Sequence, residues 1–277
     1  MENFYIITND SKDQSGEITQ EIKSYLEEKG RSCVLEQKDG EGNVLVGTVP
    51  KDLDCVIVIG GDGTLIQAAR DLIAFDLPLL GVNMGTLGYL AEIEVQNIRS
   101  AIDQLLDEKP MIEERMMLKG ALPDGREVRA LNDVVVTRLG SLRTVRFNLF
   151  VNGELLNCYQ ADGIIISTPT GSTAYNLSAG GPIVEPQASL IVVTPICSHA
   201  LNASSIVLSS ESEIVIEIGE GKNGGTEIAG ITFDGCEMTE LRTGEQVYIR
   251  KAEEKTKFLR LSKISFLEIL HRKMKGN

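Results

Sequence analysis

Histidine is scarce in this chain of 277 residues, which contains only His199 and His271. Neither residue has a partner at the spacing that zinc sites use, and neither accompanies the G-x-S-x-G turn of many serine hydrolases. The scarcity therefore argues against a zinc enzyme and against a hydrolase built on a serine–histidine pair. His199, in the segment TPICSHAL, is more typical of a structural residue than of a catalytic one.

Long apolar runs are also missing. No segment reaches the roughly 18 apolar residues that a membrane-spanning helix needs, and the opening MENFYIITND lacks the basic and then apolar pattern of a secretory signal. The five cysteines are odd in number and show no C-x-x-C spacing, which favours free thiols in a reducing compartment. We therefore expect a cytoplasmic protein that is not embedded in a membrane.

Positive charge is in deficit, because 27 lysine and arginine residues stand against 40 acidic ones and give a net charge of −13. A general nucleic-acid binder needs a basic footprint, so this class is disfavoured. Anionic small ligands stay possible if positive charge meets them locally. The basic tail at residues 250–277 is either a rim that faces phosphate or an ordinary solvated surface.

Strand and helix signals alternate over residues 1–112. Apolar runs that suit buried parallel strands are separated by apolar residues at helical spacing, and Gly30 is placed to end the first helix. The alternation predicts an α/β domain over residues 1–112. The expected strands are residues 4–9, 32–37, 54–61 and 77–83, and the expected helices are residues 18–26, 64–75 and 98–106.

The pattern changes in the second part of the chain, where short alternating segments are broken by glycine-containing turns. Few helices fit there, so we expect a β-rich domain over residues 113–262. An amphipathic helix is expected near residues 264–274, and we expect the segment 263–277 to pack back on the N-terminal domain. The turn signals are residues 123–125, 151–153, 221–225 and 234–235.

A glycine loop, GGDGT at residues 60–64, follows the apolar strand VIVI. Gly60 and Gly61 allow a sharp turn, Gly63 allows a ligand to approach the main chain, and Thr64 can cap the helix that follows. Loops of this kind cradle phosphate with backbone N–H groups. This one is neither a Walker loop nor the G-x-G-x-x-G dinucleotide fingerprint.

Asp62 is the unexpected residue of this loop, because a carboxylate repels phosphate oxygens. It is either a helix cap or turn residue, or a functional group. As a functional group it would accept a proton from an attacking hydroxyl or hold a metal ion that neutralises phosphate.

Three further loops carry polar groups after strand signals. GVNMGTLGYL at 81–90 offers Tyr89 as a stacking surface, although a buried structural tyrosine fits as well. Asn132 and Asp133 in LND form either a β-turn pair or a donor–acceptor pair for a ribose diol or an adenine edge. The segment 161–183 is dense in glycine, serine and threonine, which suits a polyhydroxylated, phosphorylated ligand, and Tyr175 could lie against a base.

Taken together, the segments GGDGT, NMGTLGYL, LND, ADG, TPTGSTAY and LSAGGPIV closely resemble, in order, the NAD kinase family. GGDGT alone is shared with diacylglycerol and sphingosine kinases, whereas GSTAY with its flanks is far more specific. The resemblance implies an enzyme that transfers the γ-phosphoryl group of ATP to the 2′-hydroxyl of the adenosine ribose of NAD, which gives NADP. It also implies a divalent cation, with Mg²⁺ expected, and homo-oligomers, commonly tetramers. The implied fold is an α/β N-terminal domain plus an all-β, β-sandwich-like C-terminal domain.

The resemblance also assigns roles to residues of this chain. Asp62 resembles the essential aspartate near the accepting hydroxyl, and Gly63 a loop contact. Asp162 resembles an acidic residue that reaches toward the nicotinamide end of a ligand bound by a neighbouring subunit. Asp234 matches a further acidic position. The implied binding residues are Tyr89, Asn132, Asp133, Thr173, Ala174, Tyr175 and Ser178, with Gly60, Gly61 and Thr64 forming the phosphate loop.

Three positions depart from the family pattern. Asp133 stands where glutamate is commoner, Ser198 replaces a proline before His199, and Gln160 replaces an arginine near Asp162. Two other functions stay open at this point. A lipid kinase that shares the GGDGT loop would need a hydrophobic groove, and a dinucleotide sensor would bind NAD without turning it over.

Overall fold

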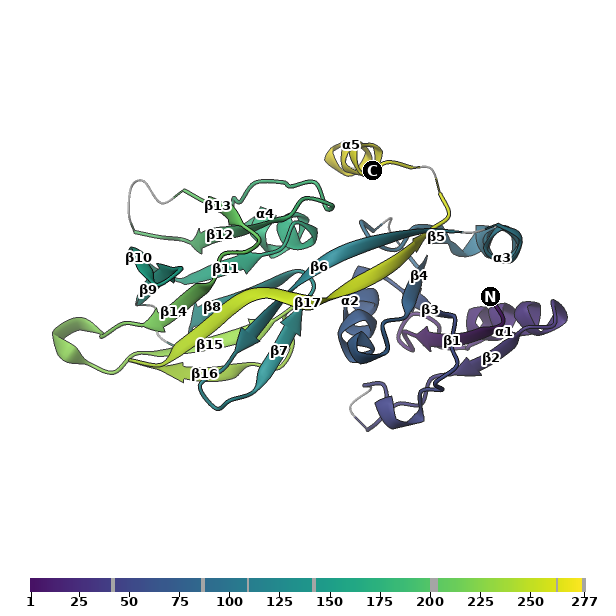
Figure 1. Cartoon of the computed structure of the whole chain (residues 1–277), viewed down its shortest axis with the longest axis horizontal. Coiled ribbons are helices and arrows are strands. Elements are labelled where there is room, and N and C mark those ends of the chain that lie inside the picture. The colour runs from purple at the N-terminus through teal and green to yellow at the C-terminus, as the bar shows by residue number, and fades with distance from the viewer. Residues whose placement is uncertain are drawn as a thin grey trace. The chain divides into compact units, whose positions relative to one another are not determined.

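The computed structural model describes residues 1–40, 43–85, 88–108, 110–140, 143–199, 204–262 and 264–275. The chain forms two compact units (Figure 1). Unit 1 comprises Met1–Arg115 and Lys255–Asn277, and unit 2 comprises Met116–Glu254. The sequence predicts domain boundaries after residues 112 and 262. In the structure, the chain passes from unit 1 to unit 2 after residue 115 and returns to unit 1 after residue 254. Both changes fall inside long strands, β6 (Met111–Ala121) and β17 (Gln246–Arg260), at places where no turn signal marks a boundary.

Unit 1 contains a parallel sheet in the order β2-β1-β3-β4. The last part of β17 pairs in parallel with β4, as does the short β5. All six positions of β3 are buried, as expected for a central strand covered on both faces. The strands are β1 (Asn3–Thr8), β2 (Ser32–Leu35), β3 (Cys55–Gly60), β4 (Pro78–Asn83), β5 (Ile93–Glu94) and the end of β17 (Gln246–Arg260).

Helices cover both faces of this sheet. Ile22 of α1 and Ile102 of α3 share a core with Leu80 of β4. Gly81, the next residue along β4, points to the other face, where a Cβ would stand 2.9 Å from Leu65 Cδ2 of α2. The helices of unit 1 are α1 (Glu17–Glu28), α2 (Asp62–Asp71), α3 (Ile98–Asp107) and α5 (Phe266–Met274), and a 3₁₀ turn spans Ile73–Phe75.

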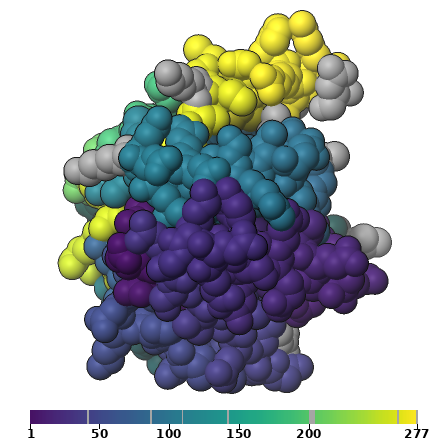
Figure 2. Space-filling view, turned by 90° about the vertical axis from the view of Figure 1, so that its right-hand side faces the viewer, coloured from purple at the N-terminus to yellow at the C-terminus, as the bar shows by residue number. Residues whose placement is uncertain are grey.

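Hydrogen bonds and an aromatic contact hold the C-terminal segment against the rest of unit 1. Glu92 accepts hydrogen bonds from the backbone N–H groups of Leu261 and Ser262. In α5, the ring of Phe266 lies 6.4 Å from that of Tyr89. Figure 2 shows the first residues of the chain, in purple, and the last ones, in yellow, on the same face. Among the described residues, no helix is long and apolar enough to cross a membrane.

Unit 2 is built from antiparallel strands. One sheet has the order β13-β12-β11-β8-β15-β16, and the strands β10-β9-β14-β17 lie in the other, as do β6 and β7, which pair with each other. The first sheet contains β8 (Asp133–Arg138), β11 (Gly163–Ser167), β12 (Leu190–Ile196), β13 (Ile206–Ser209), β15 (Ile228–Phe233) and β16 (Thr239–Arg242). The second contains β6 (Met111–Ala121), β7 (Glu127–Ala130), β9 (Val145–Val151), β10 (Glu154–Ala161) and β14 (Ile214–Ile218), with the start of β17.

Alternate residues of both sheets face one core, in which Val136 and Ile164 of the first sheet meet Phe147 and Ile216 of the second. The expected β-sandwich is therefore confirmed. The expected turns join its strands, and at 234–235 both Asp234 and Gly235 have positive φ, as a tight hairpin turn requires. A short helix, α4 (Tyr175–Ser178), follows a 3₁₀ turn at Thr170–Thr173 after β11.

Candidate functional site

The glycine loop lies at the carboxyl end of β3, where the chain turns into α2. Gly61 is the N-cap residue, and α2 begins at Asp62. The expectation that the helix starts at Thr64, capped by that side chain, is wrong. Thr64 lies in the first turn, where its hydroxyl accepts a hydrogen bond from Asn9 Nδ2 at 3.0 Å. Gly60 is needed because a Cβ there would stand 2.4 Å from Thr64 Oγ1.

Asp62 connects α2 to the segment that follows β4. Its Oδ2 accepts a hydrogen bond from the backbone N–H of Tyr89 at 2.7 Å, and its Oδ1 accepts from Leu90 and Ala91 at 3.1 Å each. The side chain does not cap its own helix. Because a carboxylate has about four lone-pair sites, these three bonds leave one acceptor site on Oδ2. Asp62 is thus held in place while it keeps capacity for one more donor.

Tyr89 lies beside this carboxylate in unit 1. Burial raises the pKa of its hydroxyl, and the charge of Asp62 adds to the effect. Lys273 of α5 places its ammonium 4.6 Å from the ring centroid. The ring therefore packs within unit 1 between α5 and the Asp62 loop. Thr86 and Leu87 of the same segment lie outside the described residues.

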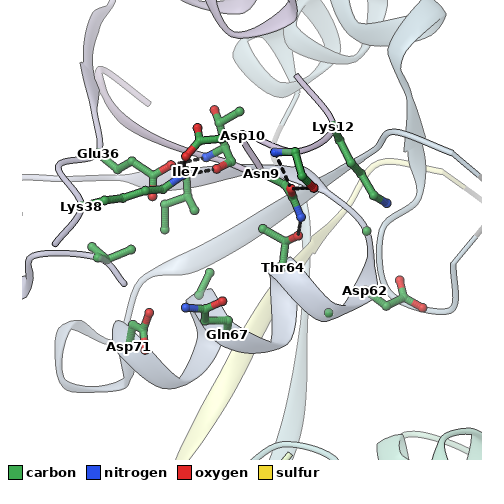
Figure 3. A pocket seen from close by; sticks show the side chains of 16 residues that line it. Ile7, Asn9, Asp10, Lys12, Glu36, Lys38, Asp62, Thr64, Gln67 and Asp71 are labelled. Atoms are coloured by element: carbon green, nitrogen blue, oxygen red, sulfur yellow. Dashed lines mark hydrogen bonds and ion pairs between the residues drawn. The ribbon is translucent and has the colours of Figure 1, made fainter. Parts of the chain in front are cut away.

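A cavity of about 530 Å³ opens beside the glycine loop in unit 1 (Figure 3). Its wall includes Gly61, Asp62, Gly63 and Thr64. Sequence reasoning missed five other charged residues that line it. They are Asp10, Lys12, Glu36, Lys38 and Asp71. The only available signal was position, since Glu36 and Lys38 follow directly after β2 and Lys12 follows β1.

In unit 2, Asp234 organises the turn that carries Asn132 and Asp133. Its carboxylate accepts backbone N–H hydrogen bonds from Leu131 at 2.8 Å, from Asn132 at 2.7 Å and from Asp133 at 3.2 Å. Asp234 itself has a φ of 52°, a left-handed conformation that aspartate tolerates in a tight turn. The residue whose role the sequence left least defined therefore positions the LND turn.

Asp133 is buried, with 4% of its surface exposed. Burial, and then the charge of Asp234, raise the pKa of its carboxyl to about 7. At neutral pH the group thus divides between a carboxylic acid, which can donate a hydrogen bond, and a carboxylate, which can only accept.

A second cavity, of about 430 Å³, lies in unit 2 against these residues. Asn132 and Asp133 line it, and so do Ala174, the N-cap residue of α4, and Tyr175, the first residue of that helix. The Tyr175 side chain is 44% exposed. Of the unit 2 residues predicted to bind, Thr173, Ser178 and Asp162 are not among those that line this cavity.

The TPTGSTAY loop is held rigidly against the LND turn. Thr168 Oγ1 donates to the carbonyl of Leu131 at 2.6 Å, and a Cβ at Gly171 would stand 2.1 Å from the carbonyl oxygen of Asn132. The buried Asn176 donates to the carbonyls of Ser172 and Pro182. The sequence suggested that the polar side chains of this loop are available to a ligand. In the structure, Thr168 and Asn176 instead form hydrogen bonds that fix the loop.

Asp162 follows β10 and pairs with Arg138 of β8, whose Nε donates to Asp162 Oδ1 at 2.8 Å. Both side chains are partly exposed. Gln160 stands where the family pattern often has an arginine near Asp162. In this structure Arg138 of β8 places a cation beside Asp162.

No group of three or more potential metal ligands from His, Cys, Asp and Glu occurs among the described residues. Mg²⁺ in phosphoryl-transfer sites needs only one or two carboxylates, because phosphates and water supply the other ligands. The open acceptor site on Asp62 fits this mode of binding. The residues present therefore fit a cation that arrives with a polyphosphate, and they do not fit a cage made of protein alone.

Comparisons with known proteins agree over nearly the whole chain. Residues 4–109 match the ATP-NAD kinase N-terminal domain, and residues 131–261 match the ATP-NAD kinase C-terminal domain. An NAD kinase of Lachnospira eligens is 44% identical, with 99% of this chain and 100% of that protein covered. An NAD kinase of Lachnoclostridium phytofermentans is 46% identical, with 99% of each covered.

Two solved structures share the fold. A yeast NADH kinase complexed with NADH has a TM-score of 0.84 at 23% identity, covering 100% of this chain and 88% of that one. An NAD kinase from Archaeoglobus fulgidus in complex with ATP has a TM-score of 0.80 at 23% identity, covering 99% of each chain. With both domain matches and relatives of 44–46% identity over their full length, this chain belongs to the NAD kinase family.

Proposed function

We propose that the chain transfers the γ-phosphoryl group of ATP to the 2′-hydroxyl of the adenosine ribose of NAD, which gives NADP and ADP. The observation that carries this proposal is the 44–46% sequence identity to NAD kinases over 99% of the chain. In the transfer, a bond forms between the ribose O2′ and the γ-phosphorus, and the bond from that phosphorus to the β–γ bridging oxygen breaks. The hydroxyl proton leaves to a protein acceptor.

Asp62 is the proposed proton acceptor. Three backbone N–H groups hold its carboxylate at the start of α2, and one acceptor site on Oδ2 stays available for the hydroxyl. A base that is positioned before the substrate arrives loses little freedom in the transition state. Gly60, Gly61, Gly63 and Thr64 form the loop that receives the phosphate.

A divalent cation, with Mg²⁺ expected, would bind through the ATP phosphates, because the one open acceptor site of Asp62 is assigned to the hydroxyl. When bound, it would neutralise charge on the transferring phosphoryl group. The Asp62 side chain would orient the accepting hydroxyl and take its proton.

Unit 2 supplies the proposed adenosine site. Asn132 and Asp133 would bind the ribose and the base edge, with Thr173, Ala174, Tyr175 and Ser178 beside them. Tyr89 of unit 1 stays a proposed binding residue. The cavity against Asp133 and Tyr175 supports this assignment. Because the Asp133 carboxyl has a pKa of about 7, it can present either a donor or an acceptor to the ligand.

Assembly and location are part of the same proposal. Asp162 would serve a site across a subunit boundary, so we expect a homo-oligomer, most simply a tetramer of closed symmetry. The five cysteines form no disulfide, which supports a cytoplasmic location.

The test is to incubate the protein with NAD, ATP and Mg²⁺ and to measure NADP. NAD with 2′-deoxyadenosine should bind as an inhibitor and give no product, because it lacks the nucleophile. A lipid kinase would give neither NADP nor this inhibition, and a sensor would bind both dinucleotides without product. Phosphate on any other ribose position would overturn the assignment of the 2′-hydroxyl.

A further inference from the structure

Four charged side chains form a buried ion chain in unit 1, made of Glu92, Glu113, Arg115 and Arg260. Glu113 and Arg115 lie near the start of β6. Arg260 is the last residue of β17, and Glu92 directly precedes β5. The exposed fraction of these side chains is between 3% and 10%. Positive and negative charges alternate along the ion chain, so that it is neutral as a whole.

Arg260 lies at the centre of this ion chain. Its Nε donates a hydrogen bond to Glu113 Oε2 at 2.5 Å, and its Nη1 donates to Glu92 Oε2 at 3.3 Å. Glu113 Oε1 pairs in turn with Arg115 Nη2 at 2.7 Å. Burial lowers the pKa of Arg115 to about 10, with Glu113 opposing the shift and Arg260 adding to it. The group therefore stays charged at neutral pH.

The ion chain ends on the segment that holds Asp62. Glu92 directly follows residues 89–91, whose N–H groups donate to the Asp62 carboxylate. Arg260 Nη1 also lies 3.4 Å from the carbonyl oxygen of Leu90, inside that segment. Among the described residues, Arg260 makes no hydrogen bond or ion pair with Asp62 itself. Its effect on that carboxylate must therefore pass through residues 89–91.

Glu92 is also held by the stretch that follows β17. Its Oε1 accepts from the N–H groups of Leu261 at 2.6 Å and Ser262 at 3.2 Å, and its Oε2 accepts from Ser262 Oγ at 2.8 Å. With the bond from Arg260, four hydrogen bonds fill the acceptor sites of this carboxylate. Glu92 thus fixes the backbone beside the N–H groups that bind Asp62.

The burial of this ion chain has a cost that apolar residues would avoid. Charged groups lose their hydration in the interior, and apolar residues of similar volume often give equal or greater stability. Apolar residues would not supply directional contacts to the backbone at Leu90 and to Glu92. A proton acceptor needs such contacts around it, because a displacement of about 1 Å can cost about 10²-fold in rate.

We propose that Arg260 and Glu92 are positioning residues for the phosphoryl transfer, which hold residues 89–91 so that the Asp62 carboxylate stands where it accepts the proton of the ribose hydroxyl. The proposal rests on the proposed kinase function and deepens it. Neither side chain lines the cavity beside the glycine loop or the cavity against Asp133. The two residues should therefore affect turnover and not substrate binding.

The first test measures kcat and both KM values of the NADP-forming reaction in Arg260→Gln and in Glu92→Gln. Each variant should lower kcat about tenfold or more. The KM values for NAD and ATP should stay within about twofold of those of the wild type. The control carries Arg99→Gln and Glu21→Gln together, an ion pair of unit 1 whose side chains are 62% and 37% exposed. It should keep the wild-type kcat.

A second test shows whether Arg260 acts through Asp62. An Asp62→Asn variant has no carboxylate left to position. Adding Arg260→Gln to it should therefore lower the residual kcat by less than about twofold, because two changes to one unit are not additive. A residue that only stabilises the fold would lower kcat by the same factor in both backgrounds.

The variant Arg260→Gln leaves Glu92 and Glu113 buried with one cation fewer, which is destabilising. The double variant Arg260→Gln/Glu92→Gln removes one charge of each sign and keeps the pair of Arg115 with Glu113. It carries the test if the single variant does not fold. Titration with NAD counts the folded sites of each variant, and kcat is expressed per site.

Three results would each overturn the positioning role while the kinase function stands. They are a wild-type kcat in Arg260→Gln or in the double variant, a loss that appears in KM and not in kcat, and an equal loss of kcat with and without Asp62→Asn. A wild-type protein that makes no NADP would instead contradict the proposed function itself.

Discussion

Gly88 lies directly against the carboxylate of Asp62, so closely that a Cβ at Gly88 would stand 2.0 Å from Asp62 Oδ1. The glycine precedes the three N–H groups that hold this carboxylate. Any side chain at this position would displace either the carboxylate or the segment 88–91. The position of the proposed base therefore depends on a residue with no chemistry of its own.

We expect Gly88→Ala to lower kcat about tenfold or more, since a small displacement of a base is costly. The strain should also destabilise the protein by about 1–3 kcal/mol. Steady-state kinetics and chemical denaturation measure the two effects. Gly40→Ala is the control, because a Cβ there meets no atom within 4 Å. Wild-type kcat in Gly88→Ala would show that the carboxylate need not stay where the N–H groups hold it.

We expect Asp62→Asn to cut kcat by roughly 10²–10⁴-fold, the range for loss of a general base, while NAD still binds. Asparagine also presents an NH₂ group toward backbone N–H donors, so we expect a stability loss of about 1–3 kcal/mol. Turnover and NAD titration separate the two roles. Near-normal turnover combined with lost stability would make Asp62 a structural tie only.

Asp133 should make stability depend on pH. Folding raises the pKa of this carboxyl to about 7, so the folded state favours its protonated form. The stabilisation is therefore complete below the pKa of the unfolded chain, near 4, and is lost as pH rises to about 7. Relative to Asp133→Asn, the wild type should lose up to about 1.4 kcal/mol per pH unit across this window.

Urea unfolding at several pH values, without ligand, measures this difference. Asp52→Asn, at an exposed position, is the control and should show no such slope. A constant difference between the wild type and Asp133→Asn from pH 4 to 8 would contradict the raised pKa.

Tyr175→Ala should raise the KM for NAD several-fold and leave kcat nearly unchanged, because its exposed ring would contribute stacking on the bound base. Its exposure also means that folding stability should hardly change. Leu177→Ala, two residues on and 39% exposed, is the matched control. An unchanged KM would remove Tyr175 from the binding pocket.

The helices and strands of unit 1 could be predicted well where the spacing of the apolar residues and the positions of the turn residues indicate the same element. The helix expected at 98–106 is α3, Ile98–Asp107, and the strand expected at 54–61 is β3, Cys55–Gly60. The start of α2 was placed two residues late, because aspartate and glycine at 62–63 are typical of a turn. Here tertiary hydrogen bonds to Asp62 override the local preference.

The site could be predicted in its motifs and not in its contacts. Asp62 binds N–H groups 27–29 residues away, and no periodicity reports such a pair. The unpartnered oxygens of Glu36 and Asp71 depend on which groups the fold leaves out, so they too are visible only in three dimensions. The sequence did predict that Asn132 and Asp133 stand at the mouth of a strand, and β8 begins at Asp133.

The pairing of Lys257 and Phe258 with Pro78 and Leu79 sets an order of events during synthesis. Unit 1 is built from two separate parts of the chain, so the outer side of β4 lacks this partner until residues 257 and 258 have been made. At translation rates of about 5–20 residues per second, that interval is on the order of ten seconds or more. Unit 2 ends at Glu254, three residues before Lys257, so the part of β17 that completes unit 2 is made only moments before the partner of β4. The two units therefore become complete almost together, when β17 leaves the ribosome.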